Sequence, residues 1–352
     1  CSLVLKDSAV DAKQTIIDVN GEQVDKQTFL NAYNYTLTMQ QYYAQMLQQF
    51  GGDGTVDEAS ILQSTLDNYI SSLVLSQKAK ELGFDQFTDA ELAELQAQAQ
   101  EEYDTQLESI RTTYFADSEL EGDALTAEVT AYAKANGYTL DYQLDTAKSN
   151  KISERLKASV TDTVTITDDD LQAALDKEVA SEKETFASTP AAYGTRVNAG
   201  TTVYYTPAGY RTIRVISVDK PTEEGASSDE AKQQIDALYL RLTAGEAFET
   251  LTEDVKTYAI CADSTTPEAD VVAAAMQLTD ALSYTEVLET EKAFYLAQLV
   301  EELPEHTATL EEARATLYDA TLTDAQDTAY NETVQGWINA ADVKTYTERL
   351  SD

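Results

Sequence analysis

The spacing of hydrophobic residues predicts a helical N-terminal half that opens with a short β-hairpin. Residues 15–19 form a β-branched run, and Asn20-Gly21 is a dipeptide typical of hairpin turns. Asp25 is suited to cap a helix that begins near Lys26. The same periodicity predicts further helices at residues 61–82, 88–109, 125–135 and 144–160 and from residue 167 onward.

The hydrophobic pattern changes after residues 188–209. These residues are rich in glycine, proline and small side chains and are the best candidate for a domain boundary. Residues 210–218 alternate as a strand. A capping-box sequence from Thr309 to Glu312 opens a long terminal helix, and residues 342–346 are expected to form a final strand. Between them we expect helices at 230–244, 248–255 and 267–278 and two strands around a turn at 289–291, which together make a compact α+β domain.

One long segment, residues 27–52, contains no charged side chain. Its aromatic and aliphatic residues fall on more than one helical face, so the helix is either wrapped by neighbours or displays an aromatic surface. We expect most of these side chains in the core of a helical domain, with some tyrosines half-buried. The alternative is a surface that binds unfolded polypeptides, for which Tyr and Met are well suited. The residues predicted for that role are Tyr35, Tyr42, Tyr43 and Met46.

The charge of the chain narrows the classes of function. Its 352 residues include 63 acidic and 24 basic side chains, which give a formal net charge of -39. This balance disfavours binding to nucleic acid and to anionic lipid, because both need clustered Lys and Arg. It favours basic clients and would keep a client-loaded protein soluble. No apolar run reaches the roughly 18 residues that span a bilayer.

Cysteine and histidine are scarce. The chain contains Cys1, Cys261 and a single histidine, His306, which we expect to be exposed to solvent. This scarcity excludes a disulfide scaffold and a Cys/His zinc site, and it disfavours hydrolase mechanisms that pair a nucleophile with histidine. Residues 168–170 are three aspartates, which suit the first turn of a helix better than a metal site. We therefore expect no cofactor and no metal.

The first residue suggests a membrane anchor. A chain that starts with Cys1 and continues with a polar stretch resembles a mature bacterial lipoprotein, cut immediately before its lipidated cysteine. On this interpretation residues 1–14 form a lipidated tether at the outer face of the cell membrane. The alternative is a chain that happens to begin at this position.

Four motifs resemble the SurA and PrsA foldase family. Residues 17–24, Ile-Asp-Val-Asn-Gly-Glu-Gln-Val, resemble the opening of these proteins, and the run 62–83 resembles a later helix. Residues 205–211, Tyr-Thr-Pro-Ala-Gly-Tyr-Arg, are similar to the start of the parvulin domain in PrsA-like lipoproteins. Residues 242–251 resemble the helix pair that follows the first parvulin strand.

The resemblance implies an α+β protein that acts as an extracytoplasmic folding factor. A helical chaperone domain would comprise residues 15–187 together with the returning C-terminal segment, residues 308–352, which places the first and last strands side by side. A parvulin-type peptidyl-prolyl isomerase domain, residues 188–307, would be inserted between them. The implied partners are unfolded or secreted polypeptides. The oligomeric state stays open.

The resemblance also implies catalytic positions, and this chain departs from most of them. Val215 and Tyr295 stand where the family has its two core histidines, whereas Cys261 falls at the family's Cys or Asp position and equally fits an ordinary buried site. The glycine-rich segment and the loop with the pocket phenylalanine have no counterpart. We therefore expect a binding chaperone with little or no isomerase activity. The alternatives are an active isomerase with a rebuilt pocket and a non-catalytic surface scaffold lipoprotein.

Overall fold

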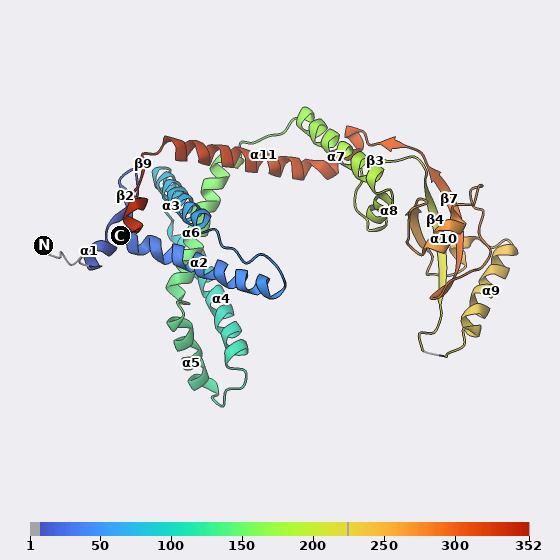
Figure 1. Cartoon of the computed structure of the whole chain (residues 1–352), viewed down its shortest axis with the longest axis horizontal. Coiled ribbons are helices and arrows are strands. Elements are labelled where there is room, and N and C mark those ends of the chain that lie inside the picture. Colours follow the sequence, from blue (N-terminus) through green and yellow to red (C-terminus); the bar gives the residue numbers. More distant parts are fainter. Residues whose placement is uncertain (1–7, 224, 352) are drawn as a thin grey trace. The chain divides into compact units, whose positions relative to one another are not determined.

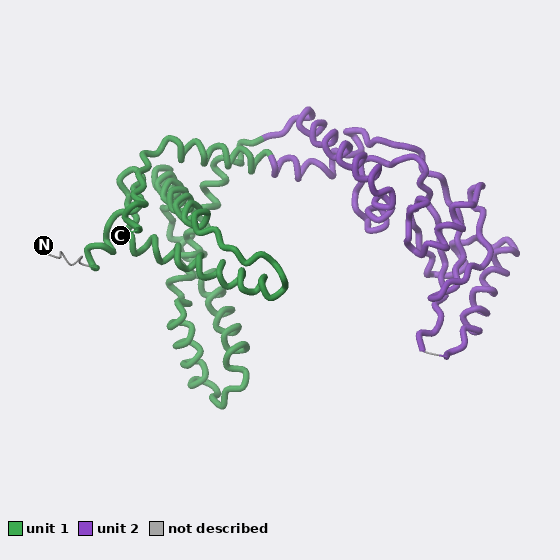
Figure 2. Tube along the Cα trace, in the orientation of Figure 1, with its two compact units in different colours: residues 1–164, 325–352 green, residues 165–324 purple. Residues whose placement is uncertain are grey.

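The computed structural model describes residues 8–223 and 225–351 and has a mainly helical α+β architecture, as predicted. The chain divides into two compact units (Figure 2). The first unit takes its described residues from 1–164 and 325–352, and the second comprises residues 165–324. The N-terminal and C-terminal segments therefore fold together.

A small antiparallel sheet joins the two ends of the chain in the first unit. Strands β1 (Thr15–Val19) and β2 (Glu22–Asp25) form the predicted hairpin, and β9 (Val343–Thr345) pairs with the other edge of β1. Asn20 and Gly21 have φ angles of 53° and 90°, in the left-handed region that such a turn requires. The expected pairing of the first and last strands is confirmed, with Ile17 opposite Thr345.

Helices make up most of the rest of the first unit, and the helix after the hairpin begins at the predicted cap, Asp25. The Asp25 carboxylate accepts a bond of 2.8 Å from the Thr28 amide, and Thr88 and Glu91 form a capping box. Phe29 packs beneath the hairpin in a core that includes Ile17. The helices are α1 (Ser8–Ala12), α2 (Lys26–Gln49), α3 (Glu58–Glu81), α4 (Asp89–Tyr114), α5 (Gly122–Ala135), α6 (Leu140–Thr161) and the last part of α11 (Leu310–Ala340).

The second unit is built around a four-stranded antiparallel sheet in the order β5-β4-β7-β6. Its central strands, β4 and β7, are labelled in Figure 1. Alternate residues of the central strands face two cores. One core is closed by α10 and contains Val215 and Tyr295, and the other is closed by α9 and contains Ile216 and Leu296. A two-stranded ribbon, β3 with β8, lies where the chain leads into and out of this sheet. The elements are α7 (Asp168–Ser188), α8 (Ala191–Asn198), β3 (Tyr205–Thr206), β4 (Tyr210–Asp219), α9 (Asp229–Thr243), β5 (Lys256–Ile260), α10 (Ala269–Ala275), β6 (Leu288–Glu289), β7 (Ala293–Leu303) and β8 (His306–Thr307), with 3-10 turns at Phe248–Thr250 and, in the first unit, Thr347–Leu350.

One local expectation is wrong, and one strand was not predicted. The helix expected at residues 248–255 is only a single 3-10 turn, and the chain then forms β5, a strand that the pattern did not predict. This edge strand is short, and its backbone is held from outside by the Asn198 side chain, which bonds both polar groups of Ala259 at 2.7 and 3.2 Å. Such a tertiary contact leaves no periodic signal in the sequence.

The borders of the compact units differ from the expected domain borders at residues 188 and 307. Helix α7 belongs to the second unit because Leu171 and Leu175 pack against Leu317 at the start of α11. The segment 188–209 is also more than a linker, since it contains α8. The assignment of chaperone and parvulin-like domains to residue ranges therefore stays a proposal.

Candidate functional site

The first half of α2 is anchored, and this fixes the position of the second half. Phe29 is fully buried, and its ring centroid lies 6.0 Å from that of Tyr69 on α3. Tyr33 packs against the same core. Helix α2 is thus held at its N-terminal end by the hairpin and by α3.

The second half of α2 presents an uncharged apolar surface to solvent. The exposed fractions of Tyr35, Tyr42, Tyr43 and Met46 are 70%, 57%, 51% and 41%. The expectation that most of them lie in the core is wrong. Apolar residues lie on more than one face of α2, and α3 covers only a part of it, so that among its described residues only Lys26, Phe29 and Ala44 are buried. We call the α2 face the set of exposed residues Tyr35, Met39, Tyr42, Tyr43, Met46, Leu47 and Phe50.

The α2 face has the properties of a contact surface without catalytic chemistry. Tyr42 and Tyr43 meet edge to face with ring centroids 5.9 Å apart. Tyr35, Met39, Tyr42 and Met46 follow one another at helical spacing, so they share one side of the helix. Methionine and tyrosine adapt to varied apolar partners.

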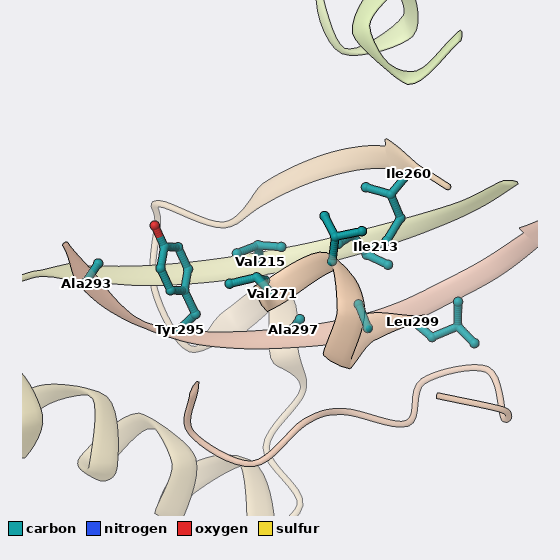
Figure 3. Close-up of a cluster of buried hydrophobic side chains, with 10 residues drawn as sticks. Ile213, Val215, Ile260, Val271, Ala293, Tyr295, Ala297 and Leu299 are labelled. Atoms are coloured by element: carbon teal, nitrogen blue, oxygen red, sulfur yellow. The ribbon is translucent and has the colours of Figure 1, made fainter. Parts of the chain in front are cut away.

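The two positions that were predicted to stand in place of the family's histidines lie in a buried core (Figure 3). Val215 and Tyr295 are both buried on the sheet face that α10 covers, and Val271 of α10 belongs to the same cluster. The Tyr295 hydroxyl donates a bond of 2.9 Å to Glu268. Burial, with a further contribution from this bond, raises the pKa of Tyr295 to about 12. No acid or base that titrates near neutral pH stands at either position.

Cys261 lies in a different core. It follows Ile260, which faces the Val215 core, and packs instead with Phe186 and Tyr210. Its amide donates to the Ser264 hydroxyl at 3.0 Å, and its sulfur lies 3.6 Å from the same oxygen. The structure therefore brings Val215 and Tyr295 into one cluster and leaves Cys261 outside it.

Tyr210 is buried beside Cys261, whereas His306 is exposed. Burial, followed by the neighbouring Cys261, raises the pKa of Tyr210, whose hydroxyl donates to the carbonyl of Pro190. His306 is exposed on β8, as expected, with Nε2 3.2 Å from Glu312 Oε2.

Glu182 is a polar residue in a core position that the sequence analysis missed. It lies on the buried face of α7 and accepts bonds of 2.7 and 2.8 Å from the amides of Tyr204 and Tyr205. Desolvation raises its pKa, although these bonds and the nearby Arg196 act in the opposite direction. A signal was present, because Glu182 interrupts the apolar stripe that runs from Leu171 to Phe186 along α7.

Three further expectations concern the lipid anchor, metal sites and membrane-spanning helices. Cys1 lies outside the described residues. Within the ranges 8–223 and 225–351, no group of three or more His, Cys, Asp or Glu side chains could hold a metal ion, and no helix has the length and apolar character needed to cross a membrane. Two of the aspartates at 168–170 have structural roles. Asp170 completes the capping box of α7, and Asp168 pairs with Arg314 at 2.7 Å.

The chain was compared with models of known protein families. Residues 4–117 match the SurA-like N-terminal domain family. The matched range includes the hairpin, α2, α3 and α4, and hence the whole α2 face. The match confirms the resemblance to SurA-like proteins for this part of the chain. No curated protein matches the chain.

Solved structures with similarity over most of the chain were also found. One is a SurA-like chaperone of Campylobacter jejuni, with 10% identity, coverage of 94% of this chain and 98% of that chain, and a TM-score of 0.35. Another is PrsA from Bacillus subtilis, with 16% identity, coverage of 94% of both chains and a TM-score of 0.24. The foldase PrsA from Streptococcus pneumoniae has 15% identity, coverage of 96% and 97%, and a TM-score of 0.23.

Proposed function

We propose that this protein is an extracytoplasmic chaperone that binds unfolded or secreted polypeptides. The observation that carries the proposal is the α2 face, an exposed and uncharged apolar surface in a chain with a net charge of -39. Contiguous apolar patches of this kind mark interaction sites on soluble domains. The face lies within the segment that matches the SurA-like N-terminal domain family.

The chemistry of the α2 face fits a partner without fixed sequence. Its phenol rings and thioether side chains offer apolar contact area and little directional bonding, which favours a broad range of apolar segments. The acidic remainder of the chain would repel other copies and keep a loaded complex soluble.

The parvulin-like part is proposed to have little or no isomerase activity. Rotation about a prolyl bond is accelerated by a pocket that holds the ring and stabilises the twisted amide, against a barrier of roughly 18–20 kcal/mol. Val215 and Tyr295 instead lie inside a packed core beneath α10, and Cys261 packs elsewhere. This packing supports low isomerase activity.

The test compares two matched double variants in an aggregation assay with a chemically unfolded client. Tyr42→Ser/Tyr43→Ser alters the α2 face, and Tyr142→Ser/Tyr318→Ser removes two tyrosines of similar exposure elsewhere. Tyr and Ser have similar helix propensities, so both variants should fold. We expect the first variant to need about tenfold more protein for equal suppression, a loss of about 1.4 kcal/mol in binding, and the second to match the wild type. Equal suppression by all three proteins would exclude the α2 face.

The same samples should be tested in a refolding reaction limited by proline isomerisation. We expect no acceleration. Faster refolding that Cys261→Ala abolishes would instead establish an active isomerase with a rebuilt pocket. Inactivity of the wild type in both assays would favour the non-catalytic scaffold.

A further inference from the structure

A pocket of about 270 Å³ lies between α4 and the C-terminal end of α5 in the first unit. The two helices lie side by side and share a small core that includes Ile110 and Ala133 (Figure 1). The volume is just below the range of about 300–1,000 Å³ that is usual for sites of drug-sized ligands, so the pocket suits a ligand of one or two small rings. Its lining residues are separate from the α2 face.

One wall of the pocket is a polar, uncharged stripe on α4. Gln106, Ser109 and Thr113 line the pocket at helical spacing. The charged residues of the same turns lie outside the pocket, where Glu108 and Arg111 pair with each other at 3.0 Å. Within residues 8–223 and 225–351, the side chains of Gln106 and Thr113 form no hydrogen bond, so their donors and acceptors are available to a ligand.

Helix α5 ends in a turn that shapes the opposite wall. Asn136 is its C-cap, and Gly137 follows with a φ angle of 83°, in the left-handed region. The Gly137 amide donates to the carbonyl of Lys134 at 3.1 Å. The Tyr138 amide donates to the carbonyl of Ala133 at 2.8 Å, which completes a Schellman motif. The motif fixes the backbone on both sides of Gly137, and Asn136 and Tyr138 both line the pocket.

Three tyrosines supply the aromatic surface of the pocket. The ring of Tyr132 is held on two sides, since its centroid lies 5.0 Å from that of Tyr114 and 5.8 Å from that of Phe115. Tyr114 and Tyr138 are more open, with exposed fractions of 63% and 39%. The Asn136 side-chain amide donates to the carbonyl of Tyr132 at 2.8 Å, which orients the side chain and leaves its oxygen as an acceptor.

We infer that this pocket binds a neutral saccharide. A sugar ring has hydroxyl groups at its edge, which donate and accept hydrogen bonds, and apolar C–H groups on its faces. The amides and hydroxyls of the pocket match the edge, and the tyrosine rings match the faces. An ionic ligand would meet no counter-ion among the lining residues, and a purely apolar ligand would leave their polar groups without partners. The inference goes beyond the proposed function, because it assigns a ligand of another chemical class to another surface.

The first measurement is calorimetric titration of the full chain with two uncharged trisaccharides, cellotriose and chitotriose, and with the anionic trigalacturonate. We expect at least one uncharged trisaccharide to bind and trigalacturonate to give no heat of binding. A free sugar and a polysaccharide share the chemistry that the pocket recognises. Retention of the protein on insoluble cellulose or chitin would assign the polymer as the ligand, whereas binding in the titration without retention would assign a free sugar.

Matched variants connect the binding to the pocket. Gln106→Ala/Tyr114→Ser removes a polar group and an aromatic ring from its lining. Gln96→Ala/Tyr142→Ser makes the same changes at exposed positions outside the pocket. Ala and Ser are both compatible with helices. We expect the first variant to weaken the Kd for the trisaccharide about tenfold and the second to leave it unchanged.

Circular dichroism checks that each variant is folded, and Gln106→Ala alone replaces the double variant if that one loses helical signal. Failure of both uncharged trisaccharides to bind would overturn the inference, and so would equal Kd values in the wild type and the pocket variant. Binding of trigalacturonate as tight as that of the uncharged sugars would also overturn it. The proposed function fails separately, because full aggregation suppression by Tyr42→Ser/Tyr43→Ser would reject the α2 face while weaker trisaccharide binding in the pocket variant would still support the saccharide site.

Discussion

Glu182 illustrates, at the scale of a single residue, how a buried carboxylate can organise the chain around it. Its side chain accepts the amides of Tyr204 and Tyr205 at 2.7 and 2.8 Å and so holds β3 against α7. Since β3 pairs with β8, this one residue secures the ribbon through which the chain leads into and out of the sheet. Two partly buried amides share its Oε2 atom.

We predict that Glu182→Ala destabilises the second unit by about 2 kcal/mol, because it leaves the amides of Tyr204 and Tyr205 without an acceptor. Glu182→Gln keeps one acceptor oxygen and should cost less. Urea unfolding of the full chain, followed by the change in midpoint, measures both. A midpoint for Glu182→Ala equal to that of the wild type would contradict the role of this carboxylate.

At the candidate site, the sequence predicts which residue types stand at single positions but not how they pack. The motifs predict that Val215 and Tyr295 stand where the family has histidines, and this correspondence stays a prediction. Their enclosure beneath α10 and the separate packing of Cys261 could not be predicted, because both depend on which face of a strand meets which helix. The exposure of Tyr42 could not be predicted for a similar reason, because the hydrophobic pattern left open whether other helices cover α2.

At the scale of the element, local rules determined the starts of helices well. The Asn20-Gly21 turn, the Asp25 cap and the Thr309 capping box were all predicted and are all present, because each depends on side chains within a few residues. Strand β5 was missed because its edge is completed by Asn198, far away in sequence. The position of α7 in the second unit was missed because contact with α11 determines it.

We predict that the Asp25 cap makes α2 sensitive to acid. Bonds from Lys13 and then from Thr28 lower the pKa of Asp25 to about 2, below its usual value of 3.8. A lowered pKa stabilises the folded state above about pH 4, and this contribution is lost as the pH falls toward 2. Asp25→Ala should cost about 1 kcal/mol at pH 7, as is typical for the loss of a cap, and close to nothing at pH 2.

The measurement is unfolding by urea at several pH values for the wild type and Asp25→Ala. The difference between the two curves removes the titration of all other carboxylates. A stability difference that stays constant from pH 7 to pH 2 would contradict the assigned role of the Asp25 charge. Asp25→Asn is the control, because it keeps a capping oxygen but removes the charge.

At the scale of the whole molecule, charge and apolar surface are separated along the sequence. The net charge of -39 is spread over the chain, whereas residues 27–52 contain none. Clients with excess Lys and Arg would be attracted over a distance set by ionic strength and then held by apolar contact on the α2 face. On this proposal, charge sets the rate of association, and the apolar contacts set the lifetime of the complex.

We predict that the association rate constant for a basic unfolded client falls about tenfold between low and high salt. The dissociation rate constant should change little, because the α2 face is uncharged. Stopped-flow fluorescence measures both constants, with an acidic unfolded client of equal length as the control. An equal salt dependence for both clients would contradict steering by the acidic surface.

The most direct test of the central claim is contact between a client and the α2 face. A photoreactive benzoylphenylalanine would replace Tyr43, which is 51% exposed, or Tyr142, which is 55% exposed on α6. After illumination with an unfolded client, we predict abundant adducts from position 43 and few from position 142. Equal or fewer adducts at position 43 would contradict the account that α2 forms the client-binding surface.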